Sequence, residues 1–392
     1  MDDKKRIPAI RFKGFTDSWE QRKLGDCCKI ATGKLDANEM DDNGFYNFYT
    51  SGVEVFKINK PAFEGPAITI AGNGANVGYM HLAEGKFNAY QRTYVLSEFL
   101  ADRLFLNIAI GNKLPNKIQE EVRGSGIPYI VLNMLTDLDI PYPISAEQIK
   151  TGFFFNRIDN LITLHQRKFE SLKKMKKALL EKMFPRDGEN IPSIRFKGFT
   201  DSWEQRKLGD VGKARSGVGF PDTEQGGTSG LPFFKVSDMN SNCNENEMTI
   251  ANNYVTAEQI SAHKWSPITE LPAIFFAKVG AAVMLNRKRI CYFPFLLDNN
   301  TMAYSLDSTK WNSDFAKAKF DTIDLTSLVQ IGALPSYNSV DVETIKIQLP
   351  NHLEQAQIGS FFKNLDNLIT LHQRKLEKFN NIKKAMLEKM FV

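Results

Sequence analysis

The stretch IPAIRFKGFTDSWEQRKLGD, residues 7–26, decides how the chain is built, because it returns as IPSIRFKGFTDSWEQRKLGD at residues 191–210. A second duplicated pair closes each half: residues 152–184 and 359–391 are identical at 22 of 33 positions. The first pair is offset by 184 residues and the second by 207, so the second half holds a block that is 23 residues longer. The chain is therefore an internal duplication. The two duplicated pairs of segments, which we call the frame, were kept, and the blocks between them diverged.

The composition is that of an ordinary globular protein, with 42% hydrophobic residues in a chain of 392. This length predicts two or three domains. The sequence has no apolar run of about 18 residues and its start lacks the apolar core of a signal peptide, so we expect a cytoplasmic protein without membrane contact. The four cysteines have no Cys-x-x-Cys spacing, which favours reduced thiols over a zinc site or disulfides.

The net charge of +5 is concentrated in the two duplicated C-terminal segments. Lys and Arg exceed Asp and Glu by five in residues 153–184 and by four in residues 360–391, which leaves the rest of the chain near −4. Any affinity of the intervening blocks for DNA must then come from local patches, because the overall field is not positive there.

Both duplicated C-terminal segments predict long amphipathic helices. Apolar residues recur at three- and four-residue steps from Ile158 to Met183 and from Leu365 to Met390, without proline or glycine between Phe153 and Phe184. Extended back to the region of Glu147, each helix would have about 38 residues and a length of about 57 Å.

A helix of that length needs a partner for its apolar stripe. We expect the two helices to pair with each other, antiparallel; the alternative is that each packs on its neighbouring block. His165 and His372 occupy equivalent positions, and we interpret them as ordinary buried histidines, because two ligands without further partners make a poor metal site.

The two blocks between the frame segments predict mixed α/β domains on a common plan. Short β-like runs occur at residues 66–70, 92–96, 272–276 and 344–349, separated by Gly, Asn and Pro. Pro128 and Pro335 correspond at the 207-residue offset. The string GNGANVG, residues 72–78, lacks the spacing of a dinucleotide-binding loop and predicts a tight turn.

No motif in the sequence predicts catalysis. The phosphate-binding loop, the Asn-Pro-Pro-Tyr string of amino-methyltransferases and the Gly-x-Ser-x-Gly elbow are all missing. With catalysis set aside, the remaining interpretation is that the loops recognise nucleic acid. Amides with Arg and Lys can pair with base edges, and a cationic run such as residues 287–289 suits phosphates.

The candidate DNA-binding residues are the loop side chains of these types. For each one the competing interpretation is a solvated side chain, so the signal lies in the collection. In the first block they are Tyr46, Asn47, Tyr49, Thr50, Ser51, Asn73, Asn76, Gln91, Arg92 and Arg123, and in the second Lys235, Ser237, Asn240, Lys278, Arg287, Lys288, Arg289, Asn299 and Asn300.

The repeated strings identify a family resemblance. Residues 12–26 and 196–210, the two copies of DNLITLHQRK ending at Lys168 and Lys375, and the KALLEKMF and KAMLEKMF ends resemble the DNA specificity subunits of type I restriction-modification enzymes, over essentially the whole chain. The resemblance implies an α+β fold: two mixed α/β target-recognition domains joined by two long antiparallel helices, a coiled-coil spacer, with internal pseudo-twofold symmetry.

The resemblance also implies function and partners. Such a subunit is not catalytic; it reads a split sequence in double-stranded DNA, two methylation subunits dock on its conserved repeats, and restriction subunits join them. It implies no cofactor in this chain, with S-adenosylmethionine, ATP and Mg²⁺ held by partner subunits. Candidates for the helix seam or the partner surface are Leu161, Leu164, Leu172, Met175, Leu368, Leu371, Phe379 and Ile382.

The expected domain boundaries follow the repeats. Conserved segments span residues 1–26 and 186–210, recognition domains 27–146 and 211–352, and long helices 147–185 and 353–392. Two alternatives differ in class: a stand-alone pseudo-dimeric repressor that binds a bipartite operator, and an enzyme with an unrecognised nuclease centre.

Overall fold

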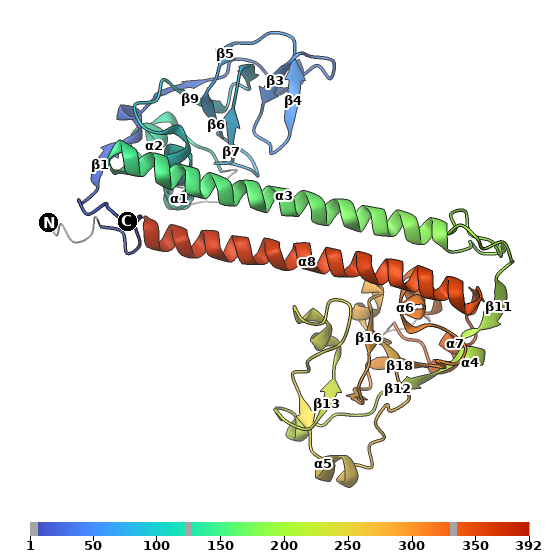
Figure 1. The fold of residues 1–392 in the computed structure, drawn as a ribbon. Helices are drawn as coiled ribbons and strands as arrows, with labels where there is room; N and C mark the ends of the chain where they lie inside the picture. Colours follow the sequence, from blue (N-terminus) through green and yellow to red (C-terminus); the bar gives the residue numbers. More distant parts are fainter. Residues whose placement is uncertain (1–6, 122–127, 330–334, 392) are drawn as a thin grey trace. The chain divides into compact units, whose positions relative to one another are not determined.

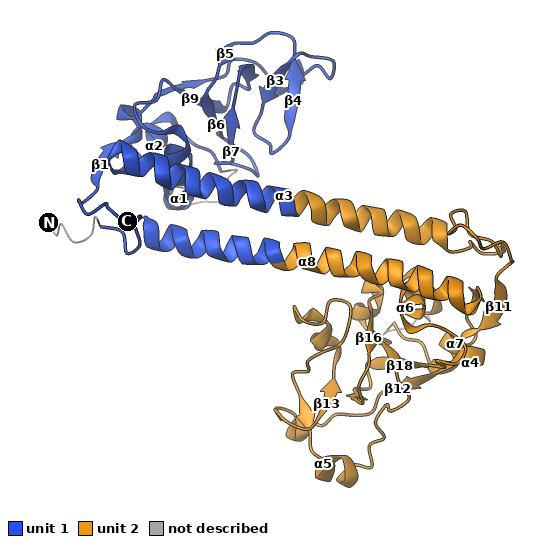
Figure 2. Cartoon of the chain, viewed as in Figure 1, with its two compact units in different colours: residues 1–165, 375–392 blue, residues 166–374 orange. Residues whose placement is uncertain are grey.

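The structure is a computed structural model that describes residues 7–121, 128–329 and 335–391 (Figure 1). The chain forms two compact units (Figure 2). Unit 1 comprises Met1–His165 and Lys375–Val392, and unit 2 comprises Gln166–Arg374. Each unit therefore takes one part of each long helix.

Unit 1 holds the first of the two blocks that lie between the duplicated segments. Its strands are β1 (Glu20–Lys23), β2 (Lys29–Thr32), β3 (Tyr46–Tyr49), β4 (Val55–Ile58), β5 (Phe63–Glu64), β6 (Ala67–Ala71), β7 (Met80–Ala83), β8 (Lys86–Ala89), β9 (Thr93–Ser97) and β10 (Asp139–Tyr142). Its helices are α1 (Arg103–Glu121), α2 (Leu132–Thr136), the short 3-10 helices η2 (Leu24–Asp26) and η3 (Ala37–Glu39), and the first part of α3 (Ser145–Met183).

Unit 2 holds the second block. Its strands are β11 (Glu204–Lys207), β12 (Gly212–Ser216), β13 (Leu231–Phe234), β14 (Tyr254–Val255), β15 (Ala273–Ala277), β16 (Lys288–Cys291), β17 (Leu296–Leu297), β18 (Thr301–Leu306) and β19 (Lys346–Leu349). Its helices are α4 (Leu208–Val211), α5 (Ala257–Ala262), α6 (Ser313–Thr322), α7 (Ser339–Glu343), most of α8 (His352–Met390), and η4 (Asp222–Glu224), η5 (Val236–Asn240), η6 (Ala281–Leu285) and η7 (Leu325–Leu328).

The same antiparallel four-stranded sheet lies at the centre of each unit. Its order is β2-β9-β6-β7 in unit 1 and β12-β18-β15-β16 in unit 2. The short apolar runs predicted as strands form β6, β9, β15 and β19. β6 and β15 are buried along their whole length, which explains why they read as continuous apolar runs without alternation.

The two copies of the duplicated N-terminal segment connect each block to a long helix. In unit 1 β1 pairs antiparallel with β10, and in unit 2 β11 pairs with β19. The Arg11 guanidinium donates to both carboxylate oxygens of Glu147 at 2.8 and 2.7 Å, and Arg195 donates to Glu354 at 2.6 and 2.8 Å. The pairing raises the pKa of both arginines. Buried paired charges of this kind fix orientation, because either partner alone would be costly.

The C-terminal phenylalanine of each long helix completes a core. Phe391 at the end of α8 packs in unit 1 against Trp19, Phe105 and Phe155, at ring-centre distances of 5.8–5.9 Å. In unit 2 Phe184, just after α3, packs in the same way against the corresponding aromatic residues Trp203, Phe315 and Phe362. Each block is thus closed by the helix that ends the other sequence repeat.

The long helices have 39 residues each, as the periodicity predicts. Within each unit their segments run antiparallel and are joined by an equivalent ion pair: Lys383 with Asp159 in unit 1, and Lys176 with Asp366 in unit 2. His165 is half-buried and stacks on Phe379 in unit 1. No helix among the described residues is long and apolar enough to cross a membrane.

Candidate nucleic-acid interface

The loops at one end of the central sheet form the candidate interface, which we call the loop edge. In unit 1 it lies where β2 and β6 end and β7 and β9 begin, as the strand register places these ends together. Gly33 donates its backbone N–H to Thr93, and Gly72 donates to Arg92, at 3.1 and 2.8 Å. Thr93 in turn donates to Tyr90 at 2.8 Å. Loops distant in sequence are therefore bonded into one surface.

The loop edge of unit 2 has the same backbone frame, at the ends of β12 and β15 and the starts of β16 and β18. Gly217 donates to Thr301 at 3.1 Å, Thr301 to Asp298 at 3.0 Å, and Lys278 to Asn300 at 2.9 Å. Each bond has its equivalent in unit 1, although the side chains differ.

Glycine is required where the first loop leaves the sheet. A Cβ on Gly33 would lie 1.9 Å from the carbonyl oxygen of Ala89, and one on Gly217 would lie 1.9 Å from that of Asp298. No backbone tolerates such contacts, so these glycines let the neighbouring loops approach each other closely.

The segments after Pro128 and Pro335 return to the loop edge. Gly74 donates to the Pro128 carbonyl at 3.1 Å, and Gly280 donates to that of Pro335 at 2.9 Å. Both glycines have positive φ, 84° and 78°, as expected for the tight turn predicted at residues 72–78 and for its equivalent at Gly280. The correspondence of the two prolines in sequence thus reflects an equivalent backbone contact.

Five of the predicted DNA-binding residues of the first block meet at the loop edge of unit 1. The Ser51 hydroxyl donates to Asn73 at 2.6 Å, which joins the end of β3 to the turn after β6. Asn76, Gln91 and Arg92 are exposed beside them. These amides and the guanidinium offer the donors and acceptors that base edges and phosphates require.

The remaining predicted residues of the first block lie on or after β3. Tyr46 and Asn47 are partly exposed, whereas Tyr49 and Thr50 are buried. The Tyr49 ring packs against His81 at 5.1 Å and edge-on against the buried Phe87 at 5.4 Å, so the core covers one side of it. Arg123 lies outside the described residues.

Unit 2 brings together five predicted residues in the same way. Asn299 and Asn300 are exposed in the turn before β18, and Lys278 follows β15. Burial lowers the pKa of Lys278. Lys235 and Ser237 follow β13, whose last residue accepts the backbone N–H of Asp298 at 3.0 Å. Because β13 pairs in parallel with β17, the segments that follow these two strands both lie at the loop edge.

The three side chains of the predicted cationic run at residues 287–289 have different environments in the structure. Arg287 donates to Asn240 at 2.8 Å, and with Arg289 these residues line a hollow of about 480 Å³ beside α3 and α8. Arg289 is partly buried and donates to backbone carbonyls. Lys288 is buried, its pKa is lowered to about 8 by desolvation, and its ammonium donates to the Ile323 carbonyl. Lys288 and Arg289 thus support the loop from inside.

Sequence reasoning missed several exposed side chains at the loop edges. Tyr129 pairs by a backbone bridge with Asn73, and Tyr79 stacks edge-on with His81 in unit 1. In unit 2 the turn between β15 and β16 exposes Met284 and Leu285. Such residues carry no recognition signature by type. Their position next to a glycine-centred turn was the available signal.

The predicted seam and partner-surface residues fall into two classes. Those that are largely exposed on the helices are Leu161, Leu164, Met175, Leu368 and Leu371. Those that are partly buried are Leu172, Phe379 and Ile382. The exposed leucines belong to the string that is identical in both repeats.

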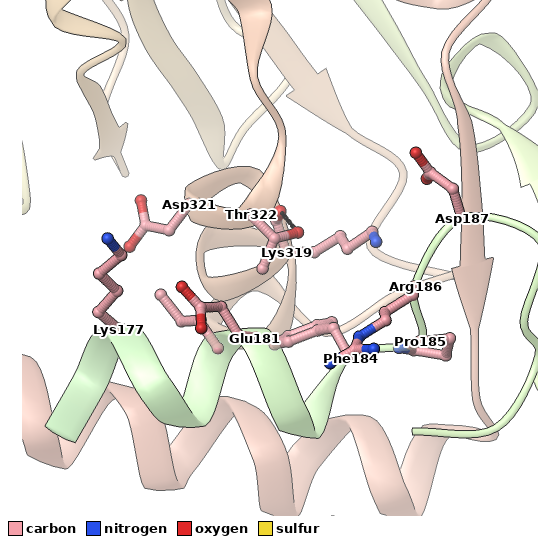
Figure 3. Close-up of a pocket in the computed structure, with 10 residues that line it drawn as sticks. Lys177, Glu181, Phe184, Pro185, Arg186, Asp187, Lys319, Asp321 and Thr322 are labelled. Atoms are coloured by element: carbon pink, nitrogen blue, oxygen red, sulfur yellow. Dashed lines mark hydrogen bonds between the residues drawn. The ribbon is translucent and has the colours of Figure 1, made fainter. Parts of the chain in front are cut away.

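A cavity of about 610 Å³ lies in unit 2 where the C-terminal ends of α3 and α6 meet (Figure 3). Lys319 is buried beside it, with its ammonium 5.5 Å from the centre of the Phe184 ring, and desolvation lowers its pKa to about 8. Lys177 and Arg186 also line the cavity. Cations near a helix C-terminus offset its partial negative charge, which accounts for Arg186 just after α3, whereas Lys319 is held in the cavity wall at a desolvation cost; we assign no ligand here.

Comparison with known proteins agrees with this arrangement. Residues 16–174 and 200–381 match the model of the type I restriction modification DNA specificity domain. The EcoDI specificity subunit of Escherichia coli is 42% identical over 130 residues, which cover 33% of this chain and 29% of that protein. The MjaVIII specificity subunit of Methanocaldococcus jannaschii is 23% identical over 95% of this chain and 91% of its own length.

A solved structure shares the fold. The S subunit of a type I restriction-modification system from M. genitalium has a TM-score of 0.74 and 17% identity, covering 98% of this chain and 99% of that one. The family match does not favour a stand-alone repressor. The chain belongs to the type I restriction-modification DNA specificity family and is a specificity subunit with two target-recognition domains.

Proposed function

We propose that the loop edge of each unit reads one half of a bipartite DNA target, with residues 27–146 and 211–352 as the two recognition domains. The observation that carries the proposal is the one-for-one match of backbone hydrogen bonds at the two loop edges, on which different side chains stand. A common frame with different side chains suits two readers of two different half-sites. The proposed contacts are the predicted residues that lie exposed at these edges.

The paired helices would act as a spacer. The equivalent ion pairs Lys383–Asp159 and Lys176–Asp366 are related by exchange of the two helices, which supports a coiled coil with internal pseudo-twofold symmetry. A stiff spacer fixes the distance between half-sites, so their centres should lie about 10 base pairs apart, one turn of the duplex.

Exposed leucines common to both repeats would receive the partners. Leu161 and Leu164 have their equivalents in Leu368 and Leu371, so the chain offers two copies of one apolar surface. Exposed apolar patches of this kind mark protein interaction sites when their residues are contiguous. They fit two methylation subunits, with restriction subunits joining in a cytoplasmic complex whose S-adenosylmethionine, ATP and Mg²⁺ belong to the partners.

Selection of DNA from a random duplex library tests the proposal. The chain assembled with its methylation subunits should recover one motif in two parts with a fixed gap. Replacing residues 27–146 with the block of another specificity subunit should change one part only. A single contiguous motif, or no motif, would refute the bipartite reader, and tight selective binding by the chain alone would favour an independent repressor.

A further inference from the structure

The turn that connects β15 to β16 presents two neighbouring large apolar side chains to solvent. Met284 and Leu285 are each 60% exposed. They lie in η6, between Lys278 and Arg287, and the residues from 278 to 287 contain no Asp or Glu. Because β15 and β16 pair from Phe276 and Lys288 onward, this whole connection belongs to the loop edge.

The turn is held firmly from behind, so the two side chains cannot retreat into the core. Val283 is buried in the main cluster of unit 2. Asn286 adopts the left-handed conformation, with φ 48° and ψ 34°. Its side chain donates to the Ile323 carbonyl at 3.3 Å and accepts the backbone N–H of Leu325 at 3.1 Å.

The side chains belong to one unit only. The equivalent connection in unit 1 lies between β6 and β7. Its Val77 corresponds to Val283, since each donates its backbone N–H to the glycine of the turn at 3.1 Å, and Gly78 and the exposed Tyr79 follow where unit 2 has Met284 and Leu285. A surface for two identical partner subunits should occur in both units, as the exposed leucines of the helices do. A surface unique to one unit suits the half-site that this unit alone reads.

We propose that Met284 and Leu285 make apolar contact with the bases of the half-site read by unit 2, and so determine part of its sequence. Such side chains discriminate bases in two ways: by packing on the thymine methyl group in the major groove, or by inserting between two base pairs and partly unstacking them. The flanking cations and the exposed amides of Asn299 and Asn300 would hold the phosphates and polar base edges around this contact.

The proposal rests on the proposed function, and the same selection experiment separates the two. With the full chain and its methylation subunits, the double variant Met284→Ala/Leu285→Ala should lose preference at one or two adjacent positions in the unit 2 part of the motif. Affinity for the wild-type site should fall roughly 5- to 100-fold, as for a mismatched base pair. The unit 1 part should not change, and the preference kept at the other positions of the unit 2 part reports that unit 2 is folded.

Val340→Ala is the matched control. Val340 is 63% exposed in α7 of the same unit, which contacts the other end of the sheet near Gly212. This variant should keep both parts of the motif and the wild-type affinity. A bipartite motif in the wild type that is unaltered in the double variant would overturn the contact proposed for Met284 and Leu285 and leave the bipartite reader standing.

A second measurement alters the DNA and leaves the protein intact. Replacing each thymine of the unit 2 half-site by uracil should weaken binding about three- to fourfold at a contacted methyl group. Alternatively, 2-aminopurine placed at each step should brighten on binding where a base is unstacked. If neither probe responds at any position, the proposed contact is wrong.

Discussion

The contacts that join each block to the long helices are alike in the two units, whereas the side chains within the two blocks differ. The ion pair Arg11–Glu147 in unit 1 recurs as Arg195–Glu354 in unit 2. The phenylalanine that fills each aromatic core, which we call the plug, is Phe391 in unit 1 and Phe184 in unit 2. By contrast, α6 of unit 2 carries Lys319 and Asp321 where α1 of unit 1 has Ala109 and Gly111. The contacts that close each unit on its helices are alike, whereas the ion pairs of Asp321 with Lys176 and Lys317 belong to unit 2, where unit 1 has Gly111 in place of Asp321.

The largest effect should come from removing the plugs. Phe391→Ala and Phe184→Ala each empty a buried aromatic site and should each lower the free energy of unfolding by about 3–5 kcal/mol. Urea unfolding followed by tryptophan fluorescence measures this, because Trp19 and Trp203 lie against the plugs. Phe153→Ala, exposed on α3, is the control and should cost less than about 1 kcal/mol. Unequal penalties for the two plugs would break the equivalence of the units.

The buried ion pairs should rank next. Glu147→Gln and Glu354→Gln keep the side-chain shape but leave the partner arginine without its counter-charge, which should cost about 3 kcal/mol in each unit. Glu204→Gln removes an exposed carboxylate that pairs with Arg206 and should cost less than about 1 kcal/mol. Chemical denaturation at pH 7 checks all three. If the substitutions in the buried and exposed pairs lower the free energy of unfolding equally, burial does not explain the contribution of the buried pairs to stability.

Lys319 should make unit 2 respond to alkaline pH. Its pKa is lowered to about 8 in the folded state, so the buried ammonium destabilises the fold below pH 8, and this penalty disappears as pH rises from 8 to about 10.5. Lys319→Met should therefore stabilise the protein at pH 7 by up to about 3 kcal/mol, less the lost contact with Phe184. The gain should vanish above pH 10.5.

Thermal unfolding across this pH range measures the Lys319 effect. Lys177→Met removes an exposed lysine from the same cavity and should shift stability by less than about 0.5 kcal/mol. A gain for Lys319→Met that does not depend on pH would show that packing, and not the buried charge, is responsible.

The smallest expected difference separates the two frame tryptophans. The indole N–H of Trp19 donates to Glu147 at 3.0 Å, whereas that of Trp203 is buried without an acceptor among the residues that the structure describes. Trp19→Phe should therefore cost about 1–2 kcal/mol more than Trp203→Phe, since only the first loses a hydrogen bond to a charged group. Paired denaturation curves give the difference, and equal costs would mean that ring packing alone decides both sites.

The candidate site was harder to predict than the fold. Asn73 and Arg92 could be chosen by residue type, but their meeting with Ser51 depends on the strand register and on Gly33. Lys288 has the type of a phosphate ligand and is buried instead. Met284 and Leu285 have no recognition signature and are exposed. Burial at a loop is set by contacts remote in sequence, which residue type alone does not report.

The sequence by itself determined the duplication, the two long helices and the main strands, because repeats, helical periodicity and apolar runs are local properties. Only the tertiary structure decided that Phe391 closes the unit built around Trp19, and that Phe184 closes the one built around Trp203. It also decided which loop cations reach solvent. These outcomes depend on packing between segments far apart in the chain, where burial and desolvation outweigh local preference.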